Sequence, residues 1–304
     1  MEGLQDIPGY GTFIKIKKLD KGWSGDEKFY IETKVGEHLL LRVADISRWE
    51  QKQAEYDTLK RVQKLNIPAP GAIDFGICDG GKRVYQLLTW VDGEDLGDAL
   101  LRLSENEQYA LGCKAGVLQR KLHRVPVKND VESWAVWYGR RVQEKLDLYF
   151  ADEQELRALK PCVDYLMQQK GLLLNRPQTF HHGDFNPTNI VLRMNGEVAA
   201  IDFNDCGRNG CDPVWEFCTI PYGQMPNAFY ESGRLDGYYG GEPPRAEFAV
   251  LAYYFAWEAL YGVVDSKKDG FMAEEGARHL RNVLQWYDNM QSVVPAWYLQ
   301  KLTV

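Results

Sequence analysis

The sequence predicts an α+β fold in two parts, an antiparallel sheet with one helix followed by a mostly helical region. Short apolar or alternating runs, which are typical of strands, occupy residues 11–19, 29–33, 39–43, 73–77 and 83–88. Apolar residues with helical spacing dominate after residue 95, at 109–123, 133–150, 153–169, 245–264 and 273–290. We therefore expect an N-terminal lobe over residues 1–91 and a helical lobe over residues 92–304.

The turn between the first two predicted strands, residues 21–26, contains two glycines and Ser24. Exposed backbone N–H groups and a serine hydroxyl in such a turn can bind phosphate groups. An ordinary hairpin loop describes the same residues nearly as well. The position of the turn ahead of Arg42, a cation on the third predicted strand, favours the binding role.

An amphipathic helix is predicted to begin near residue 47, after the third strand. Its inward face is expected to carry Ala54, Leu59, Val62 and Leu65. Pro68 and Pro70 follow and are expected to end the helix, because the residue before a proline avoids helical geometry.

The first two long helices of the C-terminal region carry distinct patterns. Gly112 and Gly116 are small residues one helical turn apart, which suits close helix packing. The next helix carries an aromatic stripe that includes Trp134, Trp137 and Tyr138. We expect this stripe to be core, with a ligand pocket as the weaker alternative.

The strongest pattern in the chain joins a polar loop, residues 181–189, to a short apolar strand that ends at Ile201. The loop carries Asp184 and Asn189, and Asp202 follows the strand directly. An aspartate can accept the proton of an attacking hydroxyl, and Asp and Asn oxygens are ligands that suit Mg²⁺. The spacing therefore predicts a phosphoryl-transfer centre, with a pair of ordinary turns as the weaker alternative.

Two histidines, His181 and His182, precede Asp184 directly. A metal-binding role would need a third ligand, and no further His or Cys stands at a ligand-like spacing. We therefore expect both histidines to brace the loop.

These motifs resemble those of the aminoglycoside phosphotransferases and their choline-kinase and other small-molecule-kinase relatives. The resemblance rests on segments 182–189, 201–203 and 211–217, and it extends more weakly over nearly the whole chain. Protein kinases are more distant, because Gly183 stands where they carry Arg and Asn204 where they carry Gly. The resemblance implies a two-lobed, protein-kinase-like fold.

The resemblance also implies roles for individual residues. Asp184 would orient the acceptor hydroxyl, and Asn189 and Asp202 would bind Mg²⁺, with ATP or GTP as the phosphate donor. Arg42 stands where the family usually presents a lysine to the α- and β-phosphates, and Glu55 would be its ion-pair partner. An arginine can replace the lysine electrostatically, but its planar head alters the geometry.

Further roles concern the hinge and the acceptor. Residues 89–93 resemble the interlobe hinge of the family, where the backbones of Trp90 and Val91 would bind the adenine edge. Glu216 stands where relatives commonly carry an Asp, and it either binds a cationic acceptor or lies exposed on a helix. Asp212 is expected to cap that helix and brace the catalytic loop.

The composition of the 304 residues is ordinary for a soluble globular protein, with a formal net charge of −7. No nucleic-acid partner is expected, because phosphate neutralisation requires clustered Lys and Arg. No uncharged apolar run is long enough to span a bilayer, and no secretory leader is evident, so we expect no membrane partner and a cytoplasmic location.

The sequence thus predicts transfer of the γ-phosphate of ATP or GTP to a hydroxyl of a small, cationic molecule. An aminoglycoside-type antibiotic is the leading acceptor, and choline, a sugar, a macrolide or another metabolite stays open. Arg42 in place of lysine also leaves open a nucleotide-binding scaffold with weak activity. The oligomeric state does not follow from the sequence.

Overall fold

The computed structural model describes residues 3–20, 25–127, 132–203, 210–220, 224–266 and 270–299, the side chains of residues 266 and 270–272 excepted. The chain forms two compact units. The N-terminal unit comprises Met1–Leu96 and Thr188–Asp205, and the helical unit comprises Gly97–Pro187 and Cys206–Val304. The first boundary lies close to the predicted division after residue 91. The segment Thr188–Asp205, however, belongs to the N-terminal unit, which a single division of the chain does not anticipate.

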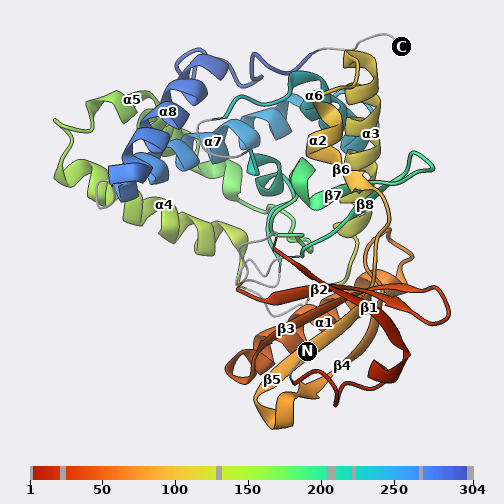
Figure 1. Cartoon of the computed structure of the whole chain (residues 1–304). Coiled ribbons are helices and arrows are strands. Elements are labelled where there is room, and N and C mark those ends of the chain that lie inside the picture. The colour runs from red at the N-terminus through yellow and green to blue at the C-terminus, as the bar shows by residue number, and fades with distance from the viewer. Residues whose placement is uncertain are drawn as a thin grey trace. The chain divides into compact units, whose positions relative to one another are not determined.

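A five-stranded antiparallel sheet forms most of the N-terminal unit, and it contains all five predicted strands (Figure 1). The strands are β1 Phe13–Leu19, β2 Glu27–Thr33, β3 His38–Asp45, β4 Ala72–Cys78 and β5 Arg83–Thr89. They lie in the order β1-β2-β3-β5-β4. Successive strands along the chain pair with each other except where α1 intervenes between β3 and β4.

One face of this sheet packs against the residues that precede it. Phe29 of β2 and Leu41 of β3 are buried together with Leu4 and Ile7. Alternate residues of a strand point to opposite faces. The neighbouring positions Lys28 and Arg42 therefore point to the other face of the sheet.

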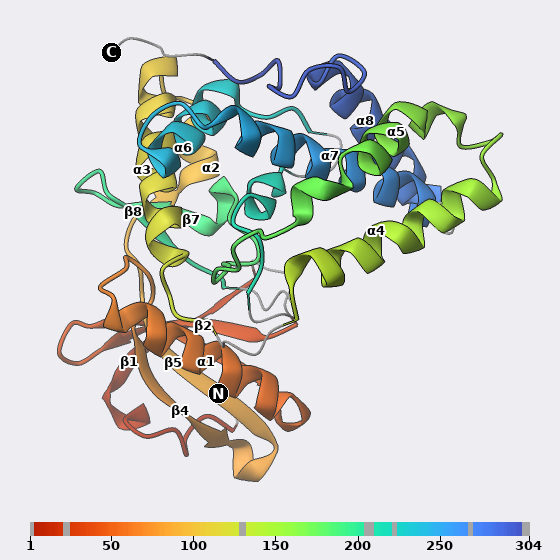
Figure 2. The ribbon, with the colours of Figure 1, turned by 180° about the vertical axis from the view of Figure 1, so that it is seen from behind.

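That other face carries α1, Trp49–Lys64, which contacts β4 and β5 (Figure 2). The buried residues of α1 are Lys52, Tyr56, Leu59 and Val62. The predicted inward face was right for Leu59 and Val62 but wrong for Ala54 and Leu65, which are exposed. Lys52 lies on the inward face because the carboxylates of Asp26 and Glu55 neutralise it there, as described below.

A second, three-stranded sheet in the N-terminal unit has the order β6-β7-β8. Its strands are β6 Glu94–Asp95, β7 Ile190–Leu192 and β8 Val198–Ala200. β7 and β8 pair in antiparallel register and form the hairpin that follows the predicted catalytic loop.

In the helical unit, α3 Glu105–Leu122 and α6 Ala228–Tyr239 pack side by side at close range (Figures 1 and 2). A Cβ on Gly112 would lie 2.1 Å from the carbonyl oxygen of Tyr230, and a Cβ on Gly233 would lie 2.1 Å from that of Tyr109. Only glycine fits at such backbone contacts. The close packing predicted from Gly112 is confirmed.

α7, Arg245–Ser266, contacts α4, α5 and α8 of this unit. The bounds of the remaining helices are α2 Leu96–Leu100, α4 Trp134–Ala151, α5 Lys160–Gln168 and α8 Gly270–Trp286. α5 begins later than the predicted residue 153, because Pro161 occupies its first turn, where a missing N–H does no harm. Within the described ranges, no helix is long and apolar enough to cross a membrane.

The aromatic stripe on α4 belongs mainly to the core of the helical unit. Trp134 and Tyr138 are buried, and the indole N–H of Trp134 donates a hydrogen bond of 2.7 Å to the hydroxyl of Tyr254. The core interpretation of this stripe is confirmed for these two residues.

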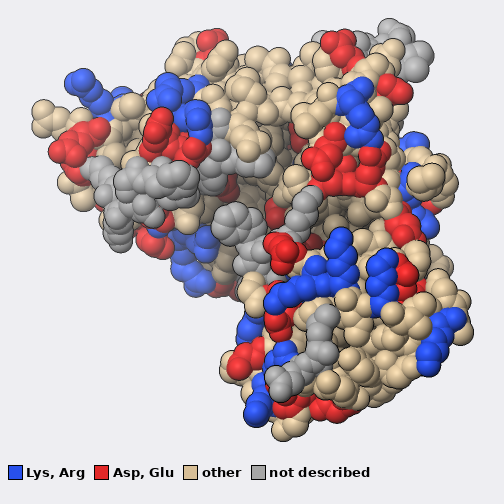
Figure 3. Space-filling view, in the orientation of Figure 1, with Lys and Arg blue, Asp and Glu red and all other residues tan. Residues whose placement is uncertain are grey.

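Exposed charges on the sheet pair across neighbouring strands. Lys15 lies 2.6 Å from Glu32, and Lys18 lies 2.7 Å from Glu27. Figure 3 shows basic and acidic side chains intermixed on the face that it displays. Such exposed pairs contribute at most about 1 kcal/mol each, so the stability of the sheet rests on its buried contacts.

A buried histidine in α8 makes the stability of the helical unit depend on pH. His279 lies between the rings of Phe255 and Trp286, and burial lowers the pKa of His279 to about 4 from an ordinary value of 6.5. Between pH 6.5 and about pH 4, His279 is therefore protonated in the unfolded chain but neutral in the folded chain. Stability falls as the pH drops from 6.5 to 4, by about 3 kcal/mol for a shift of this size.

We expect His279→Phe to flatten this decline in the free energy of unfolding, measured by urea denaturation between pH 7 and pH 4. His38→Phe removes an exposed histidine and serves as the control. An unchanged pH profile in His279→Phe would show that His279 does not produce the decline.

Candidate active site

The β7–β8 hairpin places two of the predicted site residues next to each other in the N-terminal unit. Asn189 directly precedes β7, and Asp202 follows β8 after Ile201. The carbonyl oxygen of Asn189 accepts a hydrogen bond of 2.9 Å from the N–H of Ile201. The backbone thus ties the end of the loop to the end of the strand.

Asp202 has an unusual backbone conformation and two cationic neighbours. Its φ of 58° lies in the left-handed region, which a residue with a side chain seldom adopts. Its two carboxylate oxygens lie 3.2 Å from Nη1 of Arg42 and 3.4 Å from Nζ of Lys28. Strained residues of this kind cluster at functional sites, which favours a binding role for this carboxylate.

A fully buried carboxylate, Asp26, collects three cations from β3 and the start of α1. Arg42 donates to it through Nε and Nη2 at 3.0 and 2.7 Å, Lys52 donates at 2.7 Å, and Arg48 donates at 2.6 Å. Burial alone would raise the pKa of Asp26, but Arg42 and Lys52 outweigh burial and hold this pKa below its ordinary value. Asp26 is therefore the charged centre of the network that joins the sheet to α1.

The predicted ion pair between Arg42 and Glu55 is wrong. Among the residues that the structure describes, Arg42 pairs with Asp26 and Asp202, and Glu55 lies 2.8 Å from Nζ of Lys52. Lys52 is 2% exposed and takes the place that Arg42 was expected to fill. Glu55 pairs with Lys52 because the two residues are one turn apart on the same helix, where side chains at this spacing are neighbours.

Asp26, Lys28 and Lys52 were missed as site residues. Lys52 could have been found, since the spacing of residues 52, 56, 59 and 62 matches one face of a helix. Lys52 was overlooked because charged residues usually face solvent. Asp26 and Lys28 carried no local signal, because Asp26 was expected to be part of a turn and Lys28 lay just before the predicted strand 29–33.

The nucleotide-contacting residues expected from the resemblance have mixed outcomes. Ser24 lies outside the described residues. The N–H of Trp90 donates to the carbonyl oxygen of His38 at 2.9 Å, so only the Trp90 carbonyl can serve an adenine edge. Val91 follows β5 outside any regular element, as a hinge residue would. The adenine-binding role of Trp90 and Val91 stays a prediction.

The donor set of the hairpin suits a magnesium ion. Asp202 offers a carboxylate and Asn189 an amide oxygen, and both are hard oxygen donors. The described residues contain no group of three or more His, Cys, Asp or Glu side chains that could hold a metal alone. Mg²⁺ commonly binds through one or two protein oxygens and completes its shell with phosphates and water, so the two side chains fit this ion.

Asp184 lies on the catalytic loop in the helical unit, and its neighbours orient it. Nδ2 of Asn186 donates to its carboxylate at 2.6 Å, and its own N–H donates to Nδ1 of His182 at 3.3 Å. Gly183 has a φ of 88°, a left-handed value that this turn requires. The carboxylate of Asp184 is partly exposed and oriented, as a group that accepts a hydroxyl proton should be.

Glu216 does not lie exposed on a helix, because it is 2% exposed, and its carboxylate is engaged by groups inside the protein. Its predicted role in binding an acceptor stays a prediction. Its Oε1 accepts the N–H groups of His182 and Gly183 at 2.7 and 3.0 Å, and its Oε2 lies 2.8 Å from Nε2 of His123. Burial raises the pKa of Glu216, but the histidines around it outweigh burial, and the pKa lies well below its ordinary value. Glu216 is therefore a buried anion that holds the catalytic loop in place.

The two loop histidines act as braces, as the sequence predicted. Nε2 of His181 lies 3.0 Å from the carbonyl oxygen of Asp212, and its ring stacks on His123 at 5.3 Å. Burial lowers the pKa of His181 to about 4, so the ring is neutral near pH 7. The structure agrees with the bracing role predicted for Asp212. Its predicted capping role is wrong, because the helix after it is a single turn, Trp215–Cys218, whose N-cap residue is Val214.

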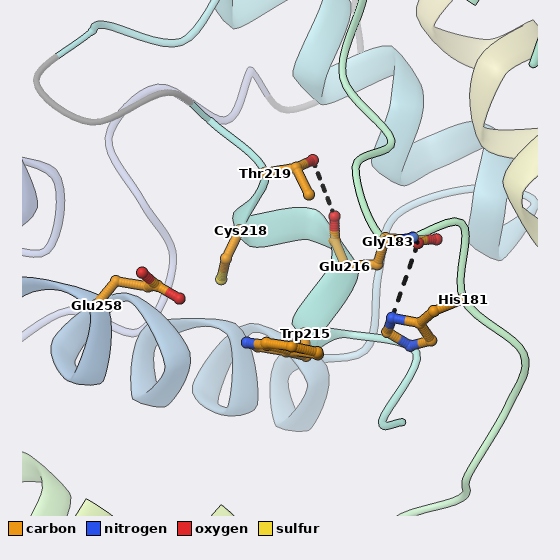
Figure 4. Close-up of a pocket in the computed structure, with 7 residues that line it drawn as sticks. All are labelled: His181, Gly183, Trp215, Glu216, Cys218, Thr219 and Glu258. Atoms are coloured by element: carbon orange, nitrogen blue, oxygen red, sulfur yellow. Dashed lines mark hydrogen bonds and ion pairs between the residues drawn. The ribbon is translucent and has the colours of Figure 1, made fainter. Parts of the chain in front are cut away.

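A cavity of about 80 Å³ lies beside the catalytic loop within the helical unit (Figure 4). Its lining residues are His181, Gly183, Trp215, Glu216, Cys218, Thr219 and Glu258. In the view of Figure 4, the Trp215–Cys218 turn lies between Glu258 of α7 and the loop that carries His181 and Gly183. Burial raises the pKa of Cys218, so its thiol is a neutral part of the wall. Trp215 and the carboxylate of Glu258 are the wall groups that suit a cation.

Comparison with protein families identifies the chain. The model of the phosphotransferase enzyme family matches residues 15–224, which include most of the sheet, the catalytic loop and the hairpin. No curated protein matches the sequence closely enough to count as a relative.

Solved structures of similar fold cover nearly the whole chain. A thermostable mutant of aminoglycoside phosphotransferase APH(4)-Ia is 17% identical over 90% of this chain and 95% of its own, with a TM-score of 0.61. The ADP-bound aminoglycoside phosphotransferase APH(2'')-Ib is 14% identical over 94% and 95%, with a TM-score of 0.60. A choline/ethanolamine kinase family protein from Mesorhizobium loti is 15% identical over 95% of both chains, with a TM-score of 0.60.

These identities show a common fold and leave the acceptor open. The family match covers more than half of the chain and includes the segments that carry the catalytic motifs. The chain is a small-molecule phosphotransferase with a protein-kinase-like fold, and it belongs to the phosphotransferase enzyme family.

Proposed function

We propose that the protein transfers the γ-phosphate of ATP or GTP to a hydroxyl of a small cationic acceptor, with an aminoglycoside-type antibiotic as the first candidate. The observation that carries the proposal is Asp202. This carboxylate has left-handed backbone geometry, shares a hairpin with Asn189 and has Arg42 and Lys28 beside it. A metal and phosphate site requires this combination of oxygen donors and cations.

Each residue has a separate task in the proposed reaction. Asp184, held by Asn186, orients the acceptor hydroxyl and accepts its proton. Asn189 and Asp202 hold Mg²⁺, which supplies the charge that neutralises the phosphates. Arg42 orients Asp202 through Nη1, and Glu55 acts on this network through Lys52.

The cavity beside the catalytic loop supports a cationic acceptor. Its volume of about 80 Å³ exceeds the roughly 10–15 Å³ that a cavity needs in order to hold one water molecule. One amino group can therefore enter beside Glu258 and the ring of Trp215, while the rest of the acceptor lies outside. The same pocket would accept choline, so the acceptor class is decided by assay.

The reaction is tested by incubating the purified protein with Mg²⁺ and radiolabelled ATP or GTP against a panel of aminoglycosides, choline, macrolides and sugars. Labelled phosphate should appear on an amine-bearing alcohol. Nucleotide binding without phosphate transfer to any panel member would contradict the proposal and favour a scaffold.

We expect Asp184→Ala to reduce kcat by about 100-fold or more, because general base catalysis contributes on that order, and to leave nucleotide affinity near the wild-type value. Asp147→Ala removes an exposed carboxylate from α4 and is the matched control. Steady-state kinetics and calorimetric titration with ATP measure the two quantities. Turnover that survives in Asp184→Ala would refute its assigned role.

We expect Glu258→Gln to raise KM for a cationic acceptor about 10-fold or more, since a charge-assisted hydrogen bond contributes about 1.5–3 kcal/mol. KM for the nucleotide should not change. Glu274→Gln alters an exposed glutamate on α8 and is the control.

Glu216→Ala separates an acceptor-binding role from a structural one. Removing this buried carboxylate leaves two loop N–H groups and His123 without their partner, so the free energy of unfolding should fall by about 3–5 kcal/mol. Suppose instead that Glu258→Gln left KM for the acceptor unchanged, while Glu216→Ala stayed stable and raised this KM. Glu216 would then bind the acceptor, and the role assigned to Glu258 would be wrong.

A further inference from the structure

Arg42, which the family resemblance selects as the phosphate-binding cation, is already engaged on all three of its guanidinium nitrogens. Nε and Nη2 donate to Asp26, and Nη1 donates to Asp202. The side chain is 10% exposed. Three of the five N–H donors of this guanidinium are thus committed to carboxylates, and at most two are left for a phosphate.

Arg42 also cannot leave its partner easily. Asp26 is fully buried, and its charge is compensated by Arg42 together with Lys52 and Arg48. Moving Arg42 towards a nucleotide would break two hydrogen bonds and leave a buried carboxylate with fewer counter-charges, which is strongly unfavourable.

Lys28 stands directly opposite Arg42 in the register between β2 and β3. Residues opposite each other in a sheet point to the same face, and both side chains reach Asp202. The only ion pair of Lys28 among the described residues is with Asp202, at 3.4 Å. This distance is beyond the usual range for such a bond.

The positive charge of Lys28 is therefore only partly compensated by Asp202, and a second anion could bind to it. Its side chain is 13% exposed, so water compensates its charge poorly. An ammonium group has three donors, and the described structure uses one of them weakly. A flexible lysine stem lets the group reach a nearby phosphate without disturbing the buried network.

We propose that Lys28 is the residue that contacts the phosphates of the nucleotide, and that Arg42 is a positioning residue that holds Asp202 and joins the sheet to α1. The proposal rests on the proposed phosphotransfer function, because it assigns a role within the nucleotide site. It moves the phosphate-binding cation from β3 to the neighbouring strand β2.

Calorimetric titration of Lys28→Met with ATP, ADP and adenosine tests this assignment. Affinity for ATP and ADP should fall about 10-fold or more, and affinity for adenosine should stay at the wild-type value, because adenosine has no phosphate. Lys28→Arg should recover part of the affinity for ATP. Lys17→Met removes an exposed lysine from β1 of the same sheet and should bind all three ligands like the wild type.

Titration in the presence of EDTA separates direct phosphate contact from an effect through the metal ligand Asp202. A direct contact predicts that Lys28→Met still binds ATP more weakly than the wild type when no divalent ion is present. A defect that disappears in EDTA would overturn the proposal, since Lys28 would then act only on metal binding.

Thermal unfolding tests the role given to Arg42. Arg42→Met should lower the melting temperature by roughly 5–10 °C, as expected for a broken buried pair, whereas Lys28→Met should leave it nearly unchanged. A stable Arg42→Met variant that loses ATP affinity, with normal ATP affinity in Lys28→Met, would assign the phosphates to Arg42 instead.

The wild-type protein distinguishes failure of this assignment from failure of the proposed function. If the wild type binds neither ATP nor GTP in the presence of Mg²⁺, both proposals fall. If the wild type binds nucleotide and phosphorylates an acceptor, but Lys28→Met matches it in ATP affinity, only the assignment of Lys28 is wrong.

Discussion

The ion pairs of the buried Asp26 carboxylate are the interactions on which the packing of the N-terminal unit depends. Asp26 stands just before β2 and draws Arg42 from β3 and Arg48 and Lys52 from the α1 region onto one point. Arg42 and Lys52 are largely buried and would repel each other without such an anion between them, and Glu55 provides a second carboxylate for Lys52. Because Arg42 also reaches Asp202, the geometry of the hairpin is linked to the packing of the sheet on its helix.

In the helical unit, a buried carboxylate likewise holds the loop that carries Asp184. Glu216 is buried beneath the catalytic loop, and it accepts the N–H groups of His182 and Gly183. A buried anion surrounded by donors holds a backbone more firmly than apolar packing could, since each lost bond would leave an unsatisfied polar group. The turn that presents Asp184 is therefore fixed from below, while Asp184 itself stays partly exposed.

A division of labour among the carboxylates follows from their burial. Asp26, Asp212 and Glu216 are buried and saturated with hydrogen bonds, so they position other groups. Asp184 and Asp202 are partly exposed and can meet a substrate or a metal. A carboxylate that takes part in the reaction must be able to exchange its partners for a substrate or a metal. A buried carboxylate with all its hydrogen bonds made cannot do this without a large cost in free energy.

Local patterns in the chain were enough to predict the five-stranded sheet, its helix, the catalytic hairpin and the family. Strand and helix periodicity, turn residues and the spacing of Asp184, Asn189 and Asp202 are short-range properties that folding does not alter. The pairing of charges was beyond such patterns: Arg42 met Asp26 rather than Glu55, and Glu216 lay buried instead of exposed on a helix. Which charges share a dry interior depends on contacts between residues far apart in the chain, and these exist only after the strands and helices have packed.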